Sequence, residues 1–547
     1  MKKPNISDLT LRQKIGQMFI MRDDRLHDMI PDEELAAFFE KNPIGGIWAT
    51  GRLNKPVECA NFESGSGAGT IFELKEYINL LNKISDIPLL VGGDSEKGGF
   101  MGATDISGPD CVAAADDDAL SYEYAYCEAQ ELACAGLNWR WSPITDMCHH
   151  DSSISVNRVC SDDPEKIIRY ANAFIKASQD VGVAATVKHF PGFDLNETRD
   201  SHFMASINNA TFEEWMAMPG RVFKETISSG VYSVMIGHHA FPAVDDSMIG
   251  TKRRPATFSK KIITDLLKND WGFDGVVVTD DIAMRSAFSI FGKERVFDCY
   301  IELINAGNDM LLGTGIGTEH EEFVTAIENA VLSGKINEER INDACTRILN
   351  MKEKLGLFSD NKPMIPDFET AAKATKEMNR KVAEKSLTLI SNNLNLLPLN
   401  KEKLKSVTII SVTHSEKFNE KLKALKEAFN ARGIEAKIYD NVYNCNLKEA
   451  SVNDDLIIYA NFVSAHQPMG RCSFFGSVAQ QFFRIMSCGA DKSLVVSFGS
   501  PFIKYEYYEE ADTYINAYWY NSEIMEALVK AILGDIPFKG VSPFKLQ

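Results

Sequence analysis

The feature that most constrains this chain is an alternation of short apolar runs with longer amphipathic stretches, which continues as far as Gly313. Such alternation is typical of repeated βα units, whose strands form a parallel sheet. Eight runs predict strands, at residues 15–20, 45–50, 88–93, 137–144, 184–189, 231–238, 275–280 and 309–313. An open doubly wound sheet is the alternative. Because eight is the number of strands that closes a (β/α)8 barrel, we expect an α/β fold with a TIM-like barrel.

The chain has 547 residues, which exceeds one ordinary hydrophobic core and predicts more than one domain. A polar, proline-punctuated segment at 358–367 marks the start of a linker. Beyond Ser386 the alternation resumes, with candidate strands at residues 387–391, 407–412, 436–439, 456–461, 493–498 and 513–518. We therefore predict a barrel domain over 1–360, a linker with a bridging helix over 361–385, and a smaller doubly wound α/β domain over 386–547.

Charge and composition exclude several classes of partner. The formal net charge of −18 argues against nucleic acid and anionic membranes, because both bind basic surfaces. No apolar run approaches the length of a membrane span, and the first residues lack the apolar core of a signal peptide. The eleven cysteines are scattered without a Cys-x-x-Cys pair. We expect a cytoplasmic protein with reduced thiols.

Polar side chains follow most of the predicted strands at the point where each strand ends. The C-terminal strand ends of a barrel meet at one face, where barrel enzymes build their active sites. The residues concerned are Arg22, Asp23, Arg52, Asp94, Glu96, Asp146, Lys188, His189, His238, His239, Asp280 and Asp281.

The fifth predicted strand ends in Lys188 and His189, and the loop after it brings Asp200 and His202 two residues apart. An Asp beside a His can fix the imidazole tautomer and raise its basicity. For an isolated Asp-x-His, a polar loop is the simpler explanation, so the interpretation depends on the rest of the chain.

Two carboxylates, Asp280 and Asp281, end the seventh predicted strand. Successive strand side chains point to opposite faces, so only one of the two can easily point into a site. A carboxylate there suits a nucleophile, and glycosidases use carboxylates in that role. The alternative is a helix N-cap before residues 282–285. We expect one Asp to act and the other to cap.

Neighbouring histidines at 149–150 and 238–239 lack metal-ligand spacing, so we expect no metal site there and no cofactor. We expect His238 and His239 to be polar strand ends, with one of them as a candidate pocket residue.

Several motifs together resemble glycoside hydrolase family 3, and within it the bacterial β-N-acetylglucosaminidase branch. The main matches are residues 188–192, 200–202 and 272–281. Supporting matches occur at residues 45–47, 94–99, 157–158, 163–164, 233–235, 306–309, 383–390, 396–398 and 498–501, so the resemblance covers nearly the whole chain. It implies a (β/α)8 barrel followed by an αβα-sandwich domain.

The resemblance also implies roles for individual residues. Asp280 resembles the nucleophile, and His202 resembles the general acid/base with Asp200 as its partner. A further set resembles the residues that bind the sugar in the −1 subsite: Asp94, Arg158, Lys188 and His189. The implied activity is that of a retaining, exo-acting β-N-acetylhexosaminidase on a small oligosaccharide or glycoside.

The sequence departs from the family pattern next to the acid/base. Phe193 and Asp194 stand where the family has His-Gly, and the loop to Asp200 is one residue longer. A β-glucosidase or β-xylosidase of the same family, a non-catalytic sugar-binding protein and a metal-dependent hydrolase are the alternatives. The oligomeric state and the use of phosphate in place of water as acceptor are left open.

Overall fold

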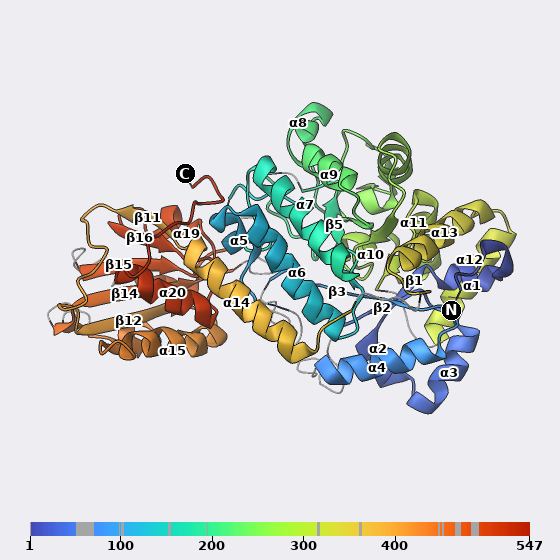
Figure 1. Cartoon of the computed structure of the whole chain (residues 1–547). Coiled ribbons are helices and arrows are strands. Elements are labelled where there is room, and N and C mark those ends of the chain that lie inside the picture. The colour runs from blue at the N-terminus through green and yellow to red at the C-terminus, as the bar shows by residue number, and fades with distance from the viewer. Residues whose placement is uncertain are drawn as a thin grey trace. The chain divides into compact units, whose positions relative to one another are not determined.

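A computed structural model describes the chain (Figure 1) except for residues 1, 51–70, 98, 100–102, 151–154, 194, 314–317, 360–363, 447–448, 451–452, 465–471, 483–491 and 547. The chain divides into two units. The first comprises Met1–Thr104, Ala125–Asp146 and Ala171–Ala372. The second comprises Asp105–Tyr124, Met147–Tyr170 and Lys373–Gln547.

The first unit contains eight short parallel strands. Five form one sheet in the order β10-β1-β2-β3-β4, and three form another in the order β5-β6-β9. Their bounds are β1 (Phe19–Arg22), β2 (Gly46–Trp48), β3 (Leu90–Gly93), β4 (Trp139–Arg140), β5 (Thr186–Phe190), β6 (Ser233–Ile236), β9 (Val276–Thr279) and β10 (Leu311–Leu312). A small antiparallel hairpin, β7 (Met248–Ile249) and β8 (Lys252–Arg253), follows β6.

Isolated parallel bridges connect the two sheets. Trp139 pairs with Ala184 between β4 and β5, and Val278 of β9 pairs with Met310 immediately before β10. Since β10 also pairs with β1, the strand pairings run in chain order and return to their start. These pairings confirm the expected α/β class with parallel strands.

The first predicted strand, 15–20, begins too early. Residues up to Gly16 form helix α1 (Leu11–Gly16), and β1 starts only at Phe19. Thr10 and Gln13 form a reciprocal capping box that starts this helix. The apolar run is therefore divided between the end of a helix and a strand.

Helices alternate with the strands of the first unit. They are α2 (Asp23–Met29), α3 (Asp32–Lys41), α4 (Ile71–Ile84), α8 (Phe212–Ala217), α9 (Pro219–Ser228), the π-helix η3 (Lys261–Asp270), α10 (Arg285–Phe291), α11 (Val296–Ala306), α12 (Thr318–Leu332) and α13 (Glu338–Lys354). Helices α6 (Asp118–Cys134) and α7 (Pro164–Val181) contribute residues to both units. Short 3₁₀ helices lie at Ile6–Asp8, Ala256–Phe258 and Lys293–Arg295. A large core cluster joins strand residues such as Val276 to helix residues such as Ile348.

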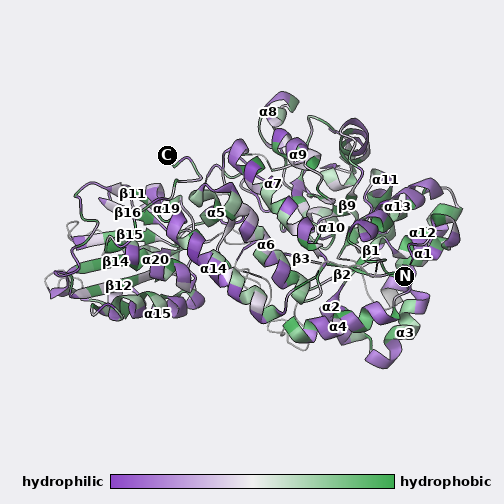
Figure 2. Ribbon diagram, viewed as in Figure 1, coloured by the Kyte–Doolittle hydropathy of each residue, from purple (hydrophilic) through white to green (hydrophobic). Residues whose placement is uncertain are grey.

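The second unit is built on a six-stranded sheet in the order β11-β16-β15-β14-β12-β13. Its strands are β11 (Thr388–Asn392), β12 (Ser406–Thr413), β13 (Glu435–Tyr439), β14 (Leu456–Phe462), β15 (Ser493–Ser497) and β16 (Thr513–Asn516). All pairs are parallel except β11 with β16. In Figure 2 the strands of this sheet carry many green, apolar residues, whereas helix α14 is banded in purple.

The helices of the second unit are α5 (Pro109–Ala115), α14 (Phe368–Ser386), α15 (Glu416–Asn430), α17 (Gly476–Gln480), α19 (Ile503–Tyr507) and α20 (Ser522–Ile532), with a 3₁₀ helix at Val442–Asn444. Helices α15 and α20 pack on each other, and α15 contacts β12 and β13. The segment Asp105–Tyr124 belongs to this unit, and Asp105 ties it there: the Asp105 carboxylate accepts from Lys421 Nζ at 2.7 Å and from Trp519 Nε1 at 3.1 Å. The domain boundaries 1–360, 361–385 and 386–547 stay a prediction.

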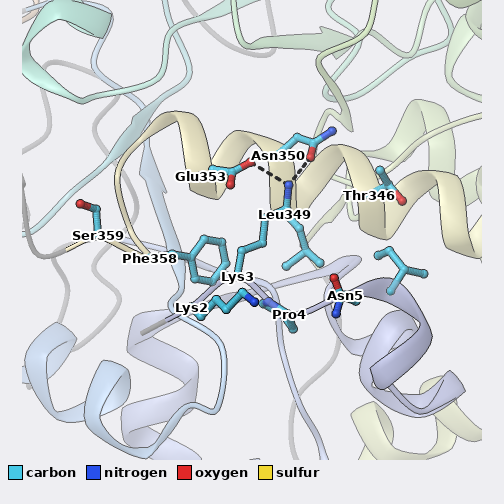
Figure 3. Close-up of a pocket in the computed structure, with 11 residues that line it drawn as sticks. Lys2, Lys3, Pro4, Asn5, Thr346, Leu349, Asn350, Glu353, Phe358 and Ser359 are labelled. Carbon is cyan, nitrogen blue, oxygen red and sulfur yellow. Dashed lines mark hydrogen bonds and ion pairs between the residues drawn. The ribbon is translucent and has the colours of Figure 1, made fainter.

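Within the described residues, nine cysteines are free and buried. No helix of the described part of the chain has the length and apolar character needed to cross a membrane. A surface cavity of about 610 Å³ lies between the N-terminal residues and α13 (Figure 3). There Lys3 Nζ donates to Asn350 Oδ1 at 2.6 Å and to Glu353 Oε2 at 2.8 Å. None of the predicted site residues lines this cavity.

The Lys352 side chain in helix α13 is fully buried in the first unit. Its ammonium donates to Gln17 Oε1 at 2.5 Å, and no carboxylate of the described residues forms an ion pair with it. Burial lowers the pKa of Lys352 to about 7. A charged ammonium without a carboxylate partner is costly in such a place.

Lys352→Met should therefore stabilise the protein most near neutral and acidic pH, and progressively less as the pH rises. The unfolded chain keeps this proton up to an ordinary lysine pKa of 10.5, whereas the folded protein releases it near pH 7, so wild-type stability rises with pH across this window. Thermal unfolding of both proteins between about pH 6 and pH 10 measures the difference. Exposed Lys335, changed to Met, is the control and should show no such trend. A pH-independent gain from Lys352→Met would contradict this account.

Candidate active site

Asp280 directly follows β9, a buried run of three valines and a threonine. Its backbone N–H donates to the carbonyl of Ile236 at 3.1 Å, which holds the end of β9 against β6. Its carboxylate Oδ1 accepts from the N–H of Asp281 at 2.8 Å. Burial opposes ionisation of Asp280, but electrostatic interactions with nearby basic side chains outweigh burial and hold its pKa below the usual value, namely those of His189, His238, His202 and Lys188. Asp280 is therefore an ionised carboxylate at neutral pH.

Asp281 does not cap a helix. Its Oδ1 accepts from the N–H of Ala283 at 2.9 Å, which closes a turn. Helix α10 begins two residues later, at Arg285, and its N-cap Met284 makes no side-chain cap hydrogen bond. The helix-cap interpretation is wrong because this turn separates the strand from the helix. Burial raises the pKa of the Asp281 carboxyl, unlike that of its neighbour.

Lys188 lies in β5, and its side chain is only 2% exposed. Its ammonium contacts two carboxylates from the end of β3, Asp94 Oδ1 at 2.9 Å and Glu96 Oε1 at 2.6 Å. Two acidic partners compensate a buried cation that would otherwise be costly. Asp94 is half exposed, so one side of this cluster faces solvent and can meet a ligand.

His189 is held by Asp146, which follows β4. Asp146 Oδ2 lies 2.6 Å from His189 Nδ1 and also accepts from the His189 backbone N–H at 3.2 Å. With Nδ1 bound in this way, Nε2 lies 4.0 Å from Asp280 Oδ2. Sequence reasoning placed Asp146 at a strand end but did not pair it with His189. The sequence signal for this contact is the position of Asp146 after β4, because β4 and β5 are neighbouring strands.

Asp200 and His202 form a second carboxylate–histidine pair. His202 Nδ1 lies 2.7 Å from Asp200 Oδ1, and the same oxygen accepts from the His202 backbone N–H at 2.8 Å. Asp200 is fully buried, whereas the His202 side chain is 31% exposed. The bond assigns the proton on Nδ1, so Nε2 is the nitrogen that can exchange a proton with a ligand.

The loop that carries this pair is fastened at both ends. At its base, Glu197 accepts from the backbone N–H of Ile207 at 2.9 Å and pairs with Arg199 through both carboxylate oxygens. At its tip, the carbonyl of His202 accepts from the N–H of Arg285 at 3.1 Å. The second bond joins the loop to α10, the helix that follows Asp280. Glu197 is a positioning residue that sequence reasoning missed.

His238 and His239 follow β6 and are both buried. His238 Nε2 lies 2.9 Å from the carbonyl of Asp281, and burial lowers the pKa of its imidazole. Burial lowers the pKa of His239 to about 4, and its ring lies 4.8 Å from that of Phe193. Both are neutral at pH 7, and His238 supports the backbone next to Asp280.

Six of the seven predicted site residues belong to the first unit, in its strands, just after them, or in the loop that follows β5: Asp94, Lys188, His189, Asp200, His202 and Asp280. Arg158 belongs to the second unit and stays a predicted substrate-binding residue. Of the residues that depart from the family pattern, Asp194 lies outside the described residues.

The model of the glycosyl hydrolase family 3 N-terminal domain matches residues 10–351. A β-N-acetylglucosaminidase/β-glucosidase of Cellulomonas fimi is 27% identical over 504 residues, which cover 85% of each chain. A β-hexosaminidase of Stenotrophomonas maltophilia strain R551-3 is 30% identical over 219 residues, which cover 40% of this chain and 60% of that one.

Among solved structures, the β-glucoside phosphorylase BglX is 25% identical with a TM-score of 0.82, over 99% of this chain and 94% of that one. A family 3 β-N-acetylglucosaminidase from Paenibacillus sp. str. FPU-7 is 24% identical with a TM-score of 0.80, over 98% of this chain and 99% of that one. The second likeness concerns the fold alone.

Proposed function

Because the chain belongs to glycosyl hydrolase family 3 and is a glycoside hydrolase, we propose that it removes terminal β-linked N-acetylglucosamine from small glycosides, as a retaining exo-acting enzyme. The observation that carries the proposal is the pairing of His202 with the buried carboxylate of Asp200 beside an ionised Asp280. Most glycosidases use two carboxylates. Here a His–Asp dyad takes the place of the second one.

The reaction has two displacements at the anomeric carbon. Asp280 attacks this carbon and forms a glycosyl ester, while the bond to the leaving oxygen breaks and His202 Nε2 protonates that oxygen. Water then attacks the same carbon, His202 takes its proton, and the ester electrons return to Asp280. Two inversions give net retention. The buried Asp200 carboxylate stabilises the imidazolium form that the first step requires.

Sugar binding is assigned to Asp94, Lys188, His189 and Arg158. Charged groups at rigid strand ends are suited to hydroxyl recognition, because charge-assisted hydrogen bonds are directional and strong. Lys188 and His189 are each held by a carboxylate, which leaves little freedom in their side chains. The name of the Cellulomonas fimi relative supports an N-acetylglucosaminide or a glucoside as substrate.

We also propose that the ring of eight strands is a (β/α)8 barrel that holds all the chemistry, followed by an αβα-sandwich domain. The closed order of strand pairings supports the barrel. The six-stranded, mostly parallel sheet supports the sandwich. Residues after Ser386 then supply no catalytic group.

Asp280→Ala should abolish turnover, because the proposal gives Asp280 the role of forming the glycosyl ester. Asp281→Ala is the matched control, and it should reduce stability while retaining activity, since Asp281 closes a turn. A 5-fluoro-N-acetylglucosaminyl fluoride, which keeps the 2-acetamido group, should add its sugar mass to the peptide that contains Asp280, as peptide mass spectrometry can measure. Labelling of a different carboxylate would reject the assignment.

His202→Ala should lose roughly 10²–10⁴-fold in kcat/KM on substrates with poor leaving groups, because these need a general acid. The loss should be much smaller on dinitrophenyl glycosides, whose leaving group departs without a proton. Asp200→Asn should behave as a milder version, since it weakens the bond that orients the ring. A series of aryl glycosides of graded phenol acidity measures this dependence, and an equal loss along the series would mean that His202 is only structural.

As a second candidate function, we propose that phosphate replaces water as the acceptor. A glutamate acting as base would be anionic and would repel phosphate, whereas a neutral His202 does not. The likeness to the β-glucoside phosphorylase BglX over almost the whole chain supports this candidate.

One experiment tests both which sugar the enzyme prefers and whether phosphate can act as the acceptor. Nitrophenyl β-N-acetylglucosaminide, β-glucoside and β-xyloside are incubated with and without millimolar phosphate, and the products are identified by mass spectrometry. We expect the N-acetylglucosaminide to be turned over fastest. If phosphate acts as the acceptor, the yield of sugar 1-phosphate should rise with phosphate concentration. Free sugar alone at every concentration would reject the phosphate acceptor. Faster turnover of the glucoside or xyloside would reject the N-acetylglucosamine preference.

A further inference from the structure

Two apolar side chains directly follow the acid/base residue and are exposed. Phe203 is 40% exposed and Met204 is 46% exposed, although most large apolar side chains of the first unit are buried. The proposed chemistry gives neither side chain a role. Their place next to His202 puts them in a position to contact a molecule bound there.

The chemistry of the acid/base limits what that molecule can be. A general acid must come within about 2.6–3.2 Å of the oxygen that it protonates, and the aglycone starts at this oxygen. Side chains next to His202 therefore flank the departing group. The Phe203 ring centroid lies 6.4 Å from that of His202, which is within reach of an aglycone whose leaving oxygen is protonated by Nε2.

The backbone holds this pair in place. The N–H groups of Phe203 and Met204 both donate to the carbonyl of Asp200, at 3.1 and 2.9 Å, so the residues form one turn with the dyad. Arg285 fixes the same turn through the His202 carbonyl at 3.1 Å. A surface that is rigid before binding loses little conformational entropy when a ligand covers it.

We propose that Phe203 and Met204 form the aglycone-binding surface of this enzyme and select leaving groups with a large apolar face. The inference rests on the proposed function, and it adds the substrate class on the leaving-group side. Aromatic and thioether side chains pack well on flat apolar groups, because both are polarizable and neither must give up a hydrogen bond. The aglycone is therefore an aryl or comparable apolar group rather than a charged one.

The test compares three N-acetylglucosaminides: the 2-naphthyl glycoside, the phenyl glycoside and the glycosyl fluoride. The alcohols released from the two aryl glycosides, 2-naphthol and phenol, have similar acidity but different apolar area, and the fluoride has no organic aglycone. For Phe203→Ala and for Met204→Ala, the ratio of kcat/KM on the naphthyl glycoside to that on the fluoride should fall on the order of tenfold. The loss of kcat/KM should appear mainly as a higher KM and should be smaller for the phenyl glycoside. Phe203→Leu should recover part of the lost activity.

Phe297→Ala is the matched control, because Phe297 is 38% exposed in α11 and packs on Phe323, and its ratio should equal that of the wild type. If the Phe203 and Met204 variants lose the same factor on the naphthyl and phenyl glycosides, whose leaving groups need the acid equally, these residues only position His202, and the inference is wrong. An unchanged ratio in both variants would also reject it. If the wild-type enzyme turns over none of the three substrates, the proposed function itself fails, and the inference fails with it.

Discussion

Charged side chains buried at the ends of parallel strands are the constraint on which the site depends. A buried ion is tolerated only when it is paired and hydrogen-bonded. Lys188 meets this requirement through Asp94 and Glu96, which come from the end of β3. The pairing joins β3 to β5, which are separated by β4, so the fold and the charge arrangement stabilise each other. Asp280 gains from the same arrangement, because Lys188 and the other basic side chains around it lower its pKa against the effect of burial.

The two carboxylate–histidine pairs have the same internal geometry but different surroundings. In both, Nδ1 is held by a buried Asp at 2.6–2.7 Å. His189 belongs to a strand and is nearly inaccessible, whereas His202 belongs to a loop and is partly exposed. A group that must protonate a departing oxygen and then meet an incoming acceptor needs access to solvent. The loop pair is therefore suited to proton transfer, and the strand pair is suited to fixing a ligand.

The sequence predicted the parallel strands well, because short apolar runs such as 276–279 are buried on both faces of the sheet. The strand prediction at 15–20 failed because the capping box of Thr10 starts a helix that takes up the first residues of that apolar run. The sequence also predicted the residues of the Asp200–His202 pair, which are close in the chain. The Asp146–His189 and Lys188–Glu96 contacts join different strands, so chain position alone could not establish them. For Asp281 the sequence could not distinguish a turn from a helix cap.

The loop that carries Asp200 and His202 is held by hydrogen bonds at more than one point. A longer loop would ordinarily place His202 less precisely, since each added residue brings conformational freedom. Here Glu197 closes the base of the loop on Ile207, and Arg285 holds its tip through the His202 carbonyl. Because Arg285 begins the helix that follows Asp280, this hydrogen bond joins the loop of His202 to the chain segment directly after Asp280. The backbone hydrogen bond from Arg285 therefore limits how far His202 can move relative to Asp280.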